Sequence, residues 1–225
     1  MRRPPPNALS FKRRLLRWFR THGRDLPWRR TRDPYRVLVS EFMPQQTQVG
    51  RVRDYYSRFL DRFPTIDRLA LARPSQVREV WQGLGYYRRA ANLHRLARIV
   101  ARDHDGVVPS DPMTLETLPG IGRYTAGAVA TFAYEKRAPA VDTNVARVLT
   151  RVFALGSRRS GKHSSPATLL RPIWELAERL LPRRPAVAWE FNQALMDLGA
   201  RICTARQPRC AECPVRPACR TGRRT

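Results

Sequence analysis

The chain has 225 residues, of which 42% are hydrophobic, and this is enough apolar material for one large or two small domains with a buried core. Its 43 Lys and Arg residues against 18 Asp and Glu give a formal net charge of +25, which predicts a polyanionic partner more readily than a merely solvated basic face. No stretch approaches the roughly 18 apolar residues that would cross a bilayer, and residues 1–7 lack the apolar core of a secretion signal. We therefore expect neither membrane insertion nor secretion.

Apolar residues recur at helical spacing along nearly the whole chain, and no stretch shows sustained alternation of period two. We therefore predict an all-α protein of about ten helices. Residues 12–20 open the series as a helix with one apolar and one cationic face. Turn signals separate the helices at residues 4–7, 26–34, 63–65, 106–112, 118–122, 137–139 and 156–166.

A carboxylate, Glu41, stands at the end of the apolar stretch 35–39. A hydrophobic helix face should not bury a carboxylate unless that group is paired or its pKa is raised. A raised pKa is what a general acid needs near neutral pH, so Glu41 is a candidate catalytic acid. Pro44 follows three residues later and is expected to end or bend this helix.

A glycine-containing turn joins two helical stretches at residues 118–127, which read Leu-Pro-Gly-Ile-Gly-Arg-Tyr-Thr-Ala-Gly. Asp111 and Pro112 open the first of these helices as N-cap and first helical residue. Gly120 and Gly122 can adopt positive φ and let another backbone approach closely. The amides at the start of the next helix then suit a phosphate oxygen, a contact that positions DNA without reading its sequence. The alternative is that the glycines serve packing alone.

Asp142 precedes an amphipathic helix whose apolar stripe is formed by Val145, Val148, Leu149, Val152 and Phe153. Thr143 or Asn144 is placed to cap the first turn of this helix. The alternative is that Asp142 is itself the cap or a partner of the helix dipole, and position alone does not decide between this and a catalytic role. The polar segment 156–166 is expected to be a surface excursion rather than a domain linker.

The four cysteines lie close together near the end of the chain, spaced C-x6-C-x2-C-x5-C at Cys203, Cys210, Cys213 and Cys219. Four clustered thiols can hold a 4Fe-4S cluster or a zinc ion. Structural zinc usually shows two close pairs of ligands, whereas only one pair is close here, so the cluster is favoured over zinc and over unligated thiols. Arginines interleave the ligands and are candidates for phosphate contacts at Arg201, Arg206, Arg209, Arg216 and Arg220.

The turn at 118–127, followed by Asp142, resembles the shared motif of the helix-hairpin-helix DNA glycosylase superfamily, Leu-Pro-Gly-(Ile/Val)-Gly-x-x-Thr-Ala with a later aspartate. Residues 40–49 closely resemble the signature Ser-Glu-x-Met-Leu-Gln-Gln-Thr-Gln-Val of MutY-type adenine DNA glycosylases. Residues 26–28, 83–87 and 191–194 match further signatures of that family in the same order. The cysteine spacing equals that of the iron-sulfur loop in endonuclease III and MutY-type enzymes, so the resemblance spans nearly the whole chain, from Leu26 to Cys219.

The resemblance implies a role for each matching residue. Glu41 would protonate adenine at N7, and Asp142 would stabilise the positive charge that develops on the sugar as the base leaves. The same match places two further residues in the catalytic group, Tyr124 and Asn144. The residues expected to line the base pocket are Trp28, Arg29, Pro44 and Gln193. Those expected to fill or wedge the disrupted base stack are Gln45, Gln46 and Tyr86. The hairpin would contact DNA through Leu118, Gly120, Gly122 and Thr125.

Tyr124 stands where bifunctional relatives carry a lysine that forms a Schiff base with the sugar. The resemblance therefore implies a monofunctional enzyme that leaves an abasic site. A tyrosine there is known from adenine glycosylases and from thymine glycosylases that act on T:G mismatches. The chain departs from the adenine family at Pro44, where leucine is usual, and at Thr143, where glycine is common. It also ends six residues after Cys219, without the Nudix-like domain that recognises 8-oxoguanine.

We expect two helical domains that flank a catalytic cleft. One is a six-helix barrel with the hairpin (residues 31–139), and the other joins residues 1–30 to 140–225 and carries the iron-sulfur loop at 203–219. The expected function is hydrolysis of the N-glycosidic bond of adenine mispaired with guanine or 8-oxoguanine, in base excision repair. The alternatives are a thymine or uracil glycosylase for T:G or U:G mismatches, and a catalytically silent iron-sulfur DNA-binding protein. We expect a cytoplasmic, nucleoid-associated monomer whose partner is double-stranded DNA with a mismatch.

Overall fold

The computed structural model describes residues 5–44, 47, 49–155 and 166–222. These residues form helices joined by turns and contain no strand, so the all-α prediction is confirmed. The polar segment predicted at 156–166 lies outside these ranges except for Pro166, the first residue of helix α10. By contacts, the chain divides into two compact units: Met1–Arg24 with Arg137–Thr225 (unit 1), and Asp25–Lys136 (unit 2). None of the helices in the described ranges is long and apolar enough to span a membrane.

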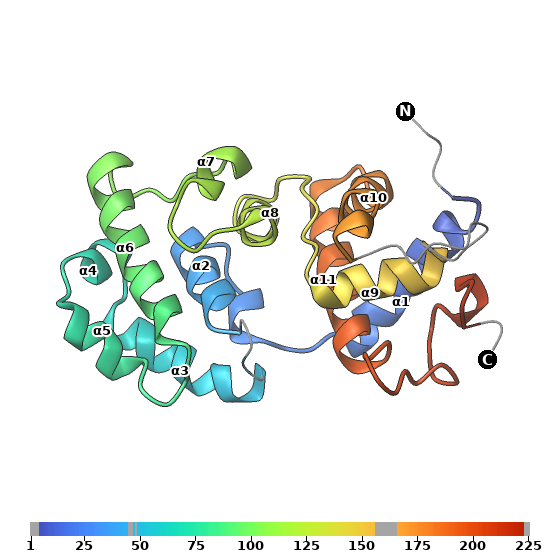
Figure 1. Cartoon of the computed structure of the whole chain (residues 1–225), viewed down its shortest axis with the longest axis horizontal. Coiled ribbons are helices and arrows are strands. Elements are labelled where there is room, and N and C mark those ends of the chain that lie inside the picture. The colour runs from blue at the N-terminus through green and yellow to red at the C-terminus, as the bar shows by residue number, and fades with distance from the viewer. Residues whose placement is uncertain (1–4, 45–46, 48, 156–165, 223–225) are drawn as a thin grey trace. The chain divides into compact units, whose positions relative to one another are not determined.

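Unit 2 runs from the short 3-10 helix η1 to helix α8 (Figure 1). Its elements are η1 (Pro27–Arg29), α2 (Pro34–Phe42), α3 (Val49–Arg62), α4 (Ile66–Ala70), α5 (Pro74–Val80), α6 (Tyr87–Asp103), α7 (Pro112–Glu116) and α8 (Arg123–Phe132). Helices α2, α4 and α5 pack against α6, while α2 and α7 pack against α8. The core that results includes the buried side chains of Leu38, Phe59, Trp81, Leu93 and Leu115.

Helix ends in unit 2 follow their local sequence. Asp111 caps α7 by accepting a hydrogen bond from the amide of Thr114 at 2.9 Å, and Pro112 is the first helical residue, as predicted. Helix α2 ends at Phe42, two residues before Pro44, whose ring nitrogen has no hydrogen to donate to a carbonyl of the preceding turn. The prediction that Pro44 ends this helix is therefore confirmed.

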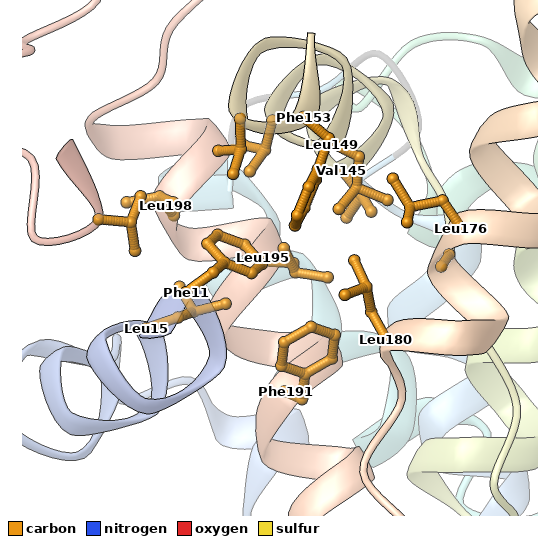
Figure 2. Close-up of a cluster of buried hydrophobic side chains, with 14 of the residues drawn as sticks. Phe11, Leu15, Val145, Leu149, Phe153, Leu176, Leu180, Phe191, Leu195 and Leu198 are labelled. Carbon is orange, nitrogen blue, oxygen red and sulfur yellow. The ribbon is translucent and has the colours of Figure 1, made fainter. Parts of the chain in front are cut away.

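Unit 1 combines segments from both ends of the chain. Its elements are α1 (Ala8–His22), α9 (Thr143–Phe153), α10 (Pro166–Leu180), α11 (Pro185–Arg201) and the 3-10 helix η2 (Arg216–Ala218). Helix α11 packs against α1 and α9, and α9 also packs against α10. All four helices contribute to one cluster of buried side chains, labelled in Figure 2 at Phe11, Leu15, Val145, Leu149, Phe153, Leu176, Leu180, Phe191, Leu195 and Leu198. The apolar stripe predicted for residues 145–153 is thus confirmed.

A buried ion pair ties the N-terminal segment of unit 1 to α11. The side chain of Asp197 is 0% exposed, and its Oδ1 lies 2.7 Å from Nη2 of Arg24. Its Oδ2 accepts a hydrogen bond from the main-chain N–H of Arg24 at 2.8 Å. Because removal of either charge would leave the other uncompensated, this pair holds the chain in place at the residue where it leaves unit 1.

Candidate active site

Glu41 lies in the last turn of α2 and is half-buried. The hydroxyl of Tyr124, in the first turn of α8, donates a hydrogen bond to Oε2 of Glu41 at 2.7 Å. The packing of α2 against α8 brings the two side chains together across 83 residues of sequence. Of the two alternatives that the sequence left open for this carboxylate, the structure shows a paired group, and its partner is one of the residues expected in the catalytic group.

The turn between α7 and α8 uses its two glycines in different ways. Gly120 has a φ of +82°, and a Cβ there would lie 2.9 Å from both Cβ of Asn92 and Cε1 of Phe42. Gly122 was also expected to allow positive φ, but it is extended, with φ −107° and ψ 176°, and a Cβ there would meet nothing within 4 Å. As the N-cap of α8 it contributes no side chain that could cap the helix. The N-terminus of α8, which is the positive end of the helix dipole, therefore has no side-chain cap, and such a helix start suits an anion.

Two other hairpin residues expected to contact DNA have buried side chains. Leu118 is 4% exposed and Thr125 is 3% exposed. Their side chains pack within unit 2 and hold the turn in shape. Only their main-chain groups are left for a DNA contact.

Asp142 is the N-cap of α9. Its Oδ1 accepts a hydrogen bond from the amide of Val145 at 2.7 Å, and its Oδ2 accepts one from Nδ2 of Asn144 at 2.8 Å. The expectation that Thr143 or Asn144 caps this helix is wrong, because an extended Asp142 reaches the first-turn amide itself. Capping does not exhaust the carboxylate, since its oxygens together accept about four hydrogen bonds. Asp142 is therefore held in one orientation and can still act on a ligand.

A hydrogen-bonded chain continues from Asn144 to the cysteine-containing tail. Oδ1 of Asn144 accepts from Nη2 of Arg147 at 2.7 Å. The same guanidinium donates to the carbonyl oxygens of Gly199 at 2.8 Å and Cys203 at 2.7 Å. Helix α11 approaches closely here, because a Cβ on Gly199 would lie only 2.7 Å from Cβ of Asn144. The roles of Arg147 and Gly199 had no signal in the sequence, since both depend on how α9 meets α11.

Asn192 in α11 positions the chain that leads to Asp142. It is 2% exposed, donates from Nδ2 to the carbonyl of Ala138 at 3.0 Å, and accepts from the amide of Ala140 at 3.2 Å. These two bonds satisfy main-chain groups of a buried segment that has no helix of its own. The neighbouring Gln193, expected in the base pocket, is also buried, at 6% exposed.

The other residues expected around the base lie in unit 2. Trp28 and Arg29 are half-buried in η1, and the Trp28 ring packs edge-on against Tyr56 with 5.2 Å between centroids. Pro44 is half-buried beyond the end of α2. Gln45 and Gln46 lie outside the described residues.

Tyr86 projects from a glycine-rich turn at the start of α6. Its side chain is 56% exposed, and its backbone is left-handed, with φ +48°. Gly83 and Gly85 before it also have positive φ, at +90° and +78°. A left-handed backbone is uncommon for residues other than glycine, and an exposed aromatic residue in that conformation is typical of a functional position.

The structure thus forms two pairs of candidate catalytic residues. Glu41 and Tyr124 are hydrogen-bonded to each other within unit 2. Asp142 and Asn144 are hydrogen-bonded to each other within unit 1.

The four cysteines form no disulfide and line one cavity of about 320 Å³ in unit 1. Burial raises the pKa of the Cys213 thiol to about 11, and the neighbouring cysteines add to this effect. Two main-chain contacts hold Cys219: its sulfur accepts from the amide of Gly222 at 3.2 Å, and the next residue, Arg220, donates its amide to the carbonyl of Val152 at 3.0 Å. Across the described ranges, no three His, Cys, Asp or Glu side chains converge closely enough for one metal ion.

Several arginines of the cysteine-containing tail, which were candidates for phosphate contacts, form hydrogen bonds within unit 1. Arg201 donates to the carbonyl of His22, and Arg209 donates to the carbonyl of Arg201 and pairs with Glu212 at 3.3 Å. Arg216 donates to the carbonyl of Gly222 at 3.3 Å. The arginines of this tail therefore fold the loop as well as charge it.

Residues 39–173 match the family described as "HhH-GPD superfamily base excision DNA repair protein". The matched range is more than half of the chain and includes Glu41, the hairpin and Asp142. The chain belongs to the HhH-GPD superfamily.

Relatives of this HhH-GPD protein include two kinds of glycosylase. The adenine DNA glycosylase of Rattus norvegicus is 44% identical over 97% of this chain, and that of Mycolicibacterium smegmatis is 48% identical over 89%. These alignments cover 43% and 66% of the relatives, so the chain spans less than half the length of the rat protein. The thymine-DNA glycosylase of Aeropyrum pernix is 38% identical, with 93% of both chains covered.

The solved structure of a thermostable thymine-DNA glycosylase has the same fold, with a TM-score of 0.86 at 32% identity, covering 97% of this chain and 98% of the other. An endonuclease III–DNA covalent intermediate reaches a TM-score of 0.78 at 23% identity, which shows the shared fold alone. The prediction of a helix-hairpin-helix glycosylase fold for this HhH-GPD chain is confirmed.

Proposed function

We propose that this HhH-GPD protein is a DNA glycosylase that hydrolyses the N-glycosidic bond of adenine mispaired with guanine or 8-oxoguanine. The observation that carries the proposal is the 2.7 Å hydrogen bond between Tyr124 and Glu41, a half-buried carboxylate in a string that resembles the adenine-glycosylase signature. The adenine DNA glycosylases that are 43–48% identical to this chain support the same substrate.

Glu41 is the proposed general acid. Adenine is a poor leaving group as an anion, and a proton on N7 lets it depart as a neutral base. The phenol of Tyr124 fixes the orientation of the carboxylate through its 2.7 Å bond, and the surrounding apolar residues of α2 reduce solvent around it.

Asp142 is the proposed stabiliser of the sugar cation. The amide of Val145 and Nδ2 of Asn144 hold its two oxygens, so that the negative charge is already oriented when positive charge develops on the sugar. Water then adds to the sugar and completes the hydrolysis. Because Tyr124 replaces the lysine of bifunctional relatives, no amine is placed there to form a Schiff base, and the product is an abasic site.

Double-stranded DNA with a mismatch is the proposed partner of a monomeric enzyme. A formal net charge of +25 provides non-specific attraction to phosphates, and the glycine-capped start of α8 provides a phosphate site. We assign Tyr86, with Gln45 and Gln46, to the gap in the base stack, since extrusion of a base needs a group that replaces it. Trp28, Arg29, Pro44 and Gln193 are the proposed pocket residues.

The four cysteines are the proposed ligands of a 4Fe-4S cluster. Thiolates are the ligands that such clusters use, and all four cysteines line one cavity of about 320 Å³. When bound, the cluster would act structurally by cross-linking the tail. This chain's own residues join that tail to α9, since Arg151 donates to the carbonyls of Thr204 at 2.7 Å and Ala205 at 2.9 Å.

A thymine or uracil glycosylase for T:G or U:G mismatches is the second candidate. It is favoured by the thymine-DNA glycosylase of Aeropyrum pernix, which matches this chain over 93% of both lengths. Tyr124 is compatible with either substrate. A catalytically silent DNA-binding protein is the third candidate, since Asp142 also has a structural role as a helix cap.

Single-turnover base release from duplexes that contain A:G, A:8-oxoguanine, T:G or U:G separates these candidates. We expect adenine release, abolished by Glu41→Gln and by Asp142→Asn, which removes the charge but keeps a good N-cap. The exposed Glu79→Gln in α5 is the matched control. Release of thymine with adenine untouched would replace the adenine proposal with its competitor. Equal release by the wild type and Asp142→Asn would show that the catalytic assignment is wrong.

A further inference from the structure

Arg89 is a buried cation in the first turn of α6, with only 8% of its surface exposed. Its Nη1 donates to the carbonyl oxygens of Phe42 at 3.1 Å and Met43 at 2.6 Å. Its Nη2 donates to Oγ1 of Thr47 at 3.0 Å and to the carbonyl of Gly85 at 3.3 Å. One guanidinium therefore joins two segments that are separated by about forty residues of sequence.

The first segment is the end of α2. The last carbonyl groups of a helix have no partner within the helix and carry the negative end of its dipole. Arg89 supplies both a donor and a positive charge to the carbonyls of Phe42 and Met43, the two residues directly after Glu41. It thereby fixes the turn of α2 that holds the carboxylate.

The second segment is the left-handed turn that presents Tyr86. The carbonyl of Gly85 accepts from Arg89 and also from Nε1 of the buried Trp81, at 3.1 Å. The guanidinium carbon of Arg89 lies 5.2 Å from the centroid of the exposed Tyr86 ring, within the range of a cation–π contact. A left-handed non-glycine residue is disfavoured by about 1–2 kcal/mol, so this turn needs such contacts to persist.

We propose that Arg89 is a positioning residue that joins the end of α2 bearing Glu41 to the turn bearing Tyr86, so that the catalytic acid and the base-stack wedge keep one geometry. This inference rests on the proposed function for the roles of Glu41 and Tyr86. Nη1 and Nη2 of the guanidinium each donate to two oxygen atoms, and the single ammonium group of a lysine cannot reach the partners of both nitrogens. Burial lowers the pKa of the Arg89 guanidinium, and the electrostatic interaction with Tyr86 raises it in part.

The test compares Arg89→Met and Arg89→Lys with Arg88→Met, which removes the same charge from the neighbouring exposed position. At saturating enzyme, we expect both Arg89 variants to release adenine between about 10- and 100-fold more slowly, because a small misplacement of catalytic groups has effects of that size. Arg88→Met should change only the affinity for DNA. Full activity of Arg89→Lys would show that charge alone is needed and would overturn the proposal.

A second readout does not depend on base release. 2-Aminopurine placed beside the mismatch becomes brighter when the stack is opened, so its fluorescence reports insertion of the wedge. We expect Arg89→Met to reduce this signal in the wild-type background and to have no further effect in the Tyr86→Leu background, since the two residues act as one unit. Additive effects of the two substitutions would refute the coupling. If the wild type releases no base from any duplex, the proposed function fails, and the fluorescence cycle still decides the role of Arg89.

Discussion

Replacement of Gly199 by alanine tests whether the contact between α11 and α9 positions Asp142. An added Cβ would lie 2.7 Å from Cβ of Asn144 and 3.0 Å from its carbonyl oxygen, whereas carbon atoms in contact are normally about 3.5–4.0 Å apart. The first turn of α9 must therefore move by about 1 Å. Since Asn144 donates to Asp142, that movement displaces the carboxylate.

Two effects of different size should follow. Overpacking should lower the free energy of unfolding by about 1–3 kcal/mol, as measured by thermal or urea unfolding. A displacement of about 1 Å at a catalytic group should slow single-turnover base release by about 100-fold. The rate should therefore fall by more than the loss of folded protein explains.

The matched control is Gly50→Ala in α3, where an added Cβ meets nothing within 4 Å. That substitution should leave base release unchanged and stabilise the helix by about 0.5–1 kcal/mol. A Gly199→Ala protein as stable and as active as the wild type would refute the idea that α11 sets the position of Asp142.

Further predictions concern four other residues. Tyr124→Phe should slow base release by about 10- to 100-fold, because a hydrogen bond to a charged group contributes about 1.5–3 kcal/mol. Asp197→Ala should lower the free energy of unfolding by about 3 kcal/mol, since it leaves Arg24 without its buried partner; a loss below about 0.5 kcal/mol would contradict this. Burial lowers the pKa of His94, so below about pH 6.5 the unfolded chain takes up a proton that the folded chain does not, and the free energy of unfolding decreases as the pH is lowered. In urea unfolding, His94→Gln should show a smaller decrease over the same pH range. Cys213→Ser should reduce the iron content and the visible absorption of the purified protein, and zinc in place of iron would rule out the cluster.

Local patterns were predicted correctly where neighbouring residues determine them. The stripe 145–153 became a buried helix face because helical spacing places those residues on one side. Asp111 and Pro112 opened α7, and Pro44 followed the end of α2, because capping and proline geometry act over a few residues. These signals were enough to predict an all-α chain and the hairpin.

Contacts across the chain were not predictable in the same way. Arg24 and Asp197, or Asn192 and Ala138, become partners only when helices from distant parts of the sequence pack together. Nothing near Arg89 in the sequence distinguishes it from the exposed Arg88 beside it. Gly122 has the same residue type as Gly120 but an extended backbone, because its place as an N-cap determines its conformation.

The assembly of unit 1 from both ends of the chain has a consequence for how the protein folds during synthesis. Helix α1 leaves the ribosome before α11, which packs against it and is completed roughly 180 residues later. At about 5–20 residues per second this interval is roughly 10 to 40 s, during which the apolar side chains of Phe11 and Leu15 lack the part of their buried cluster that α11 contributes. Unit 2 is complete within that time and contains its own core. A nascent chain halted after unit 2 has emerged should therefore carry a protease-resistant helical body behind a protease-sensitive, chaperone-binding arm.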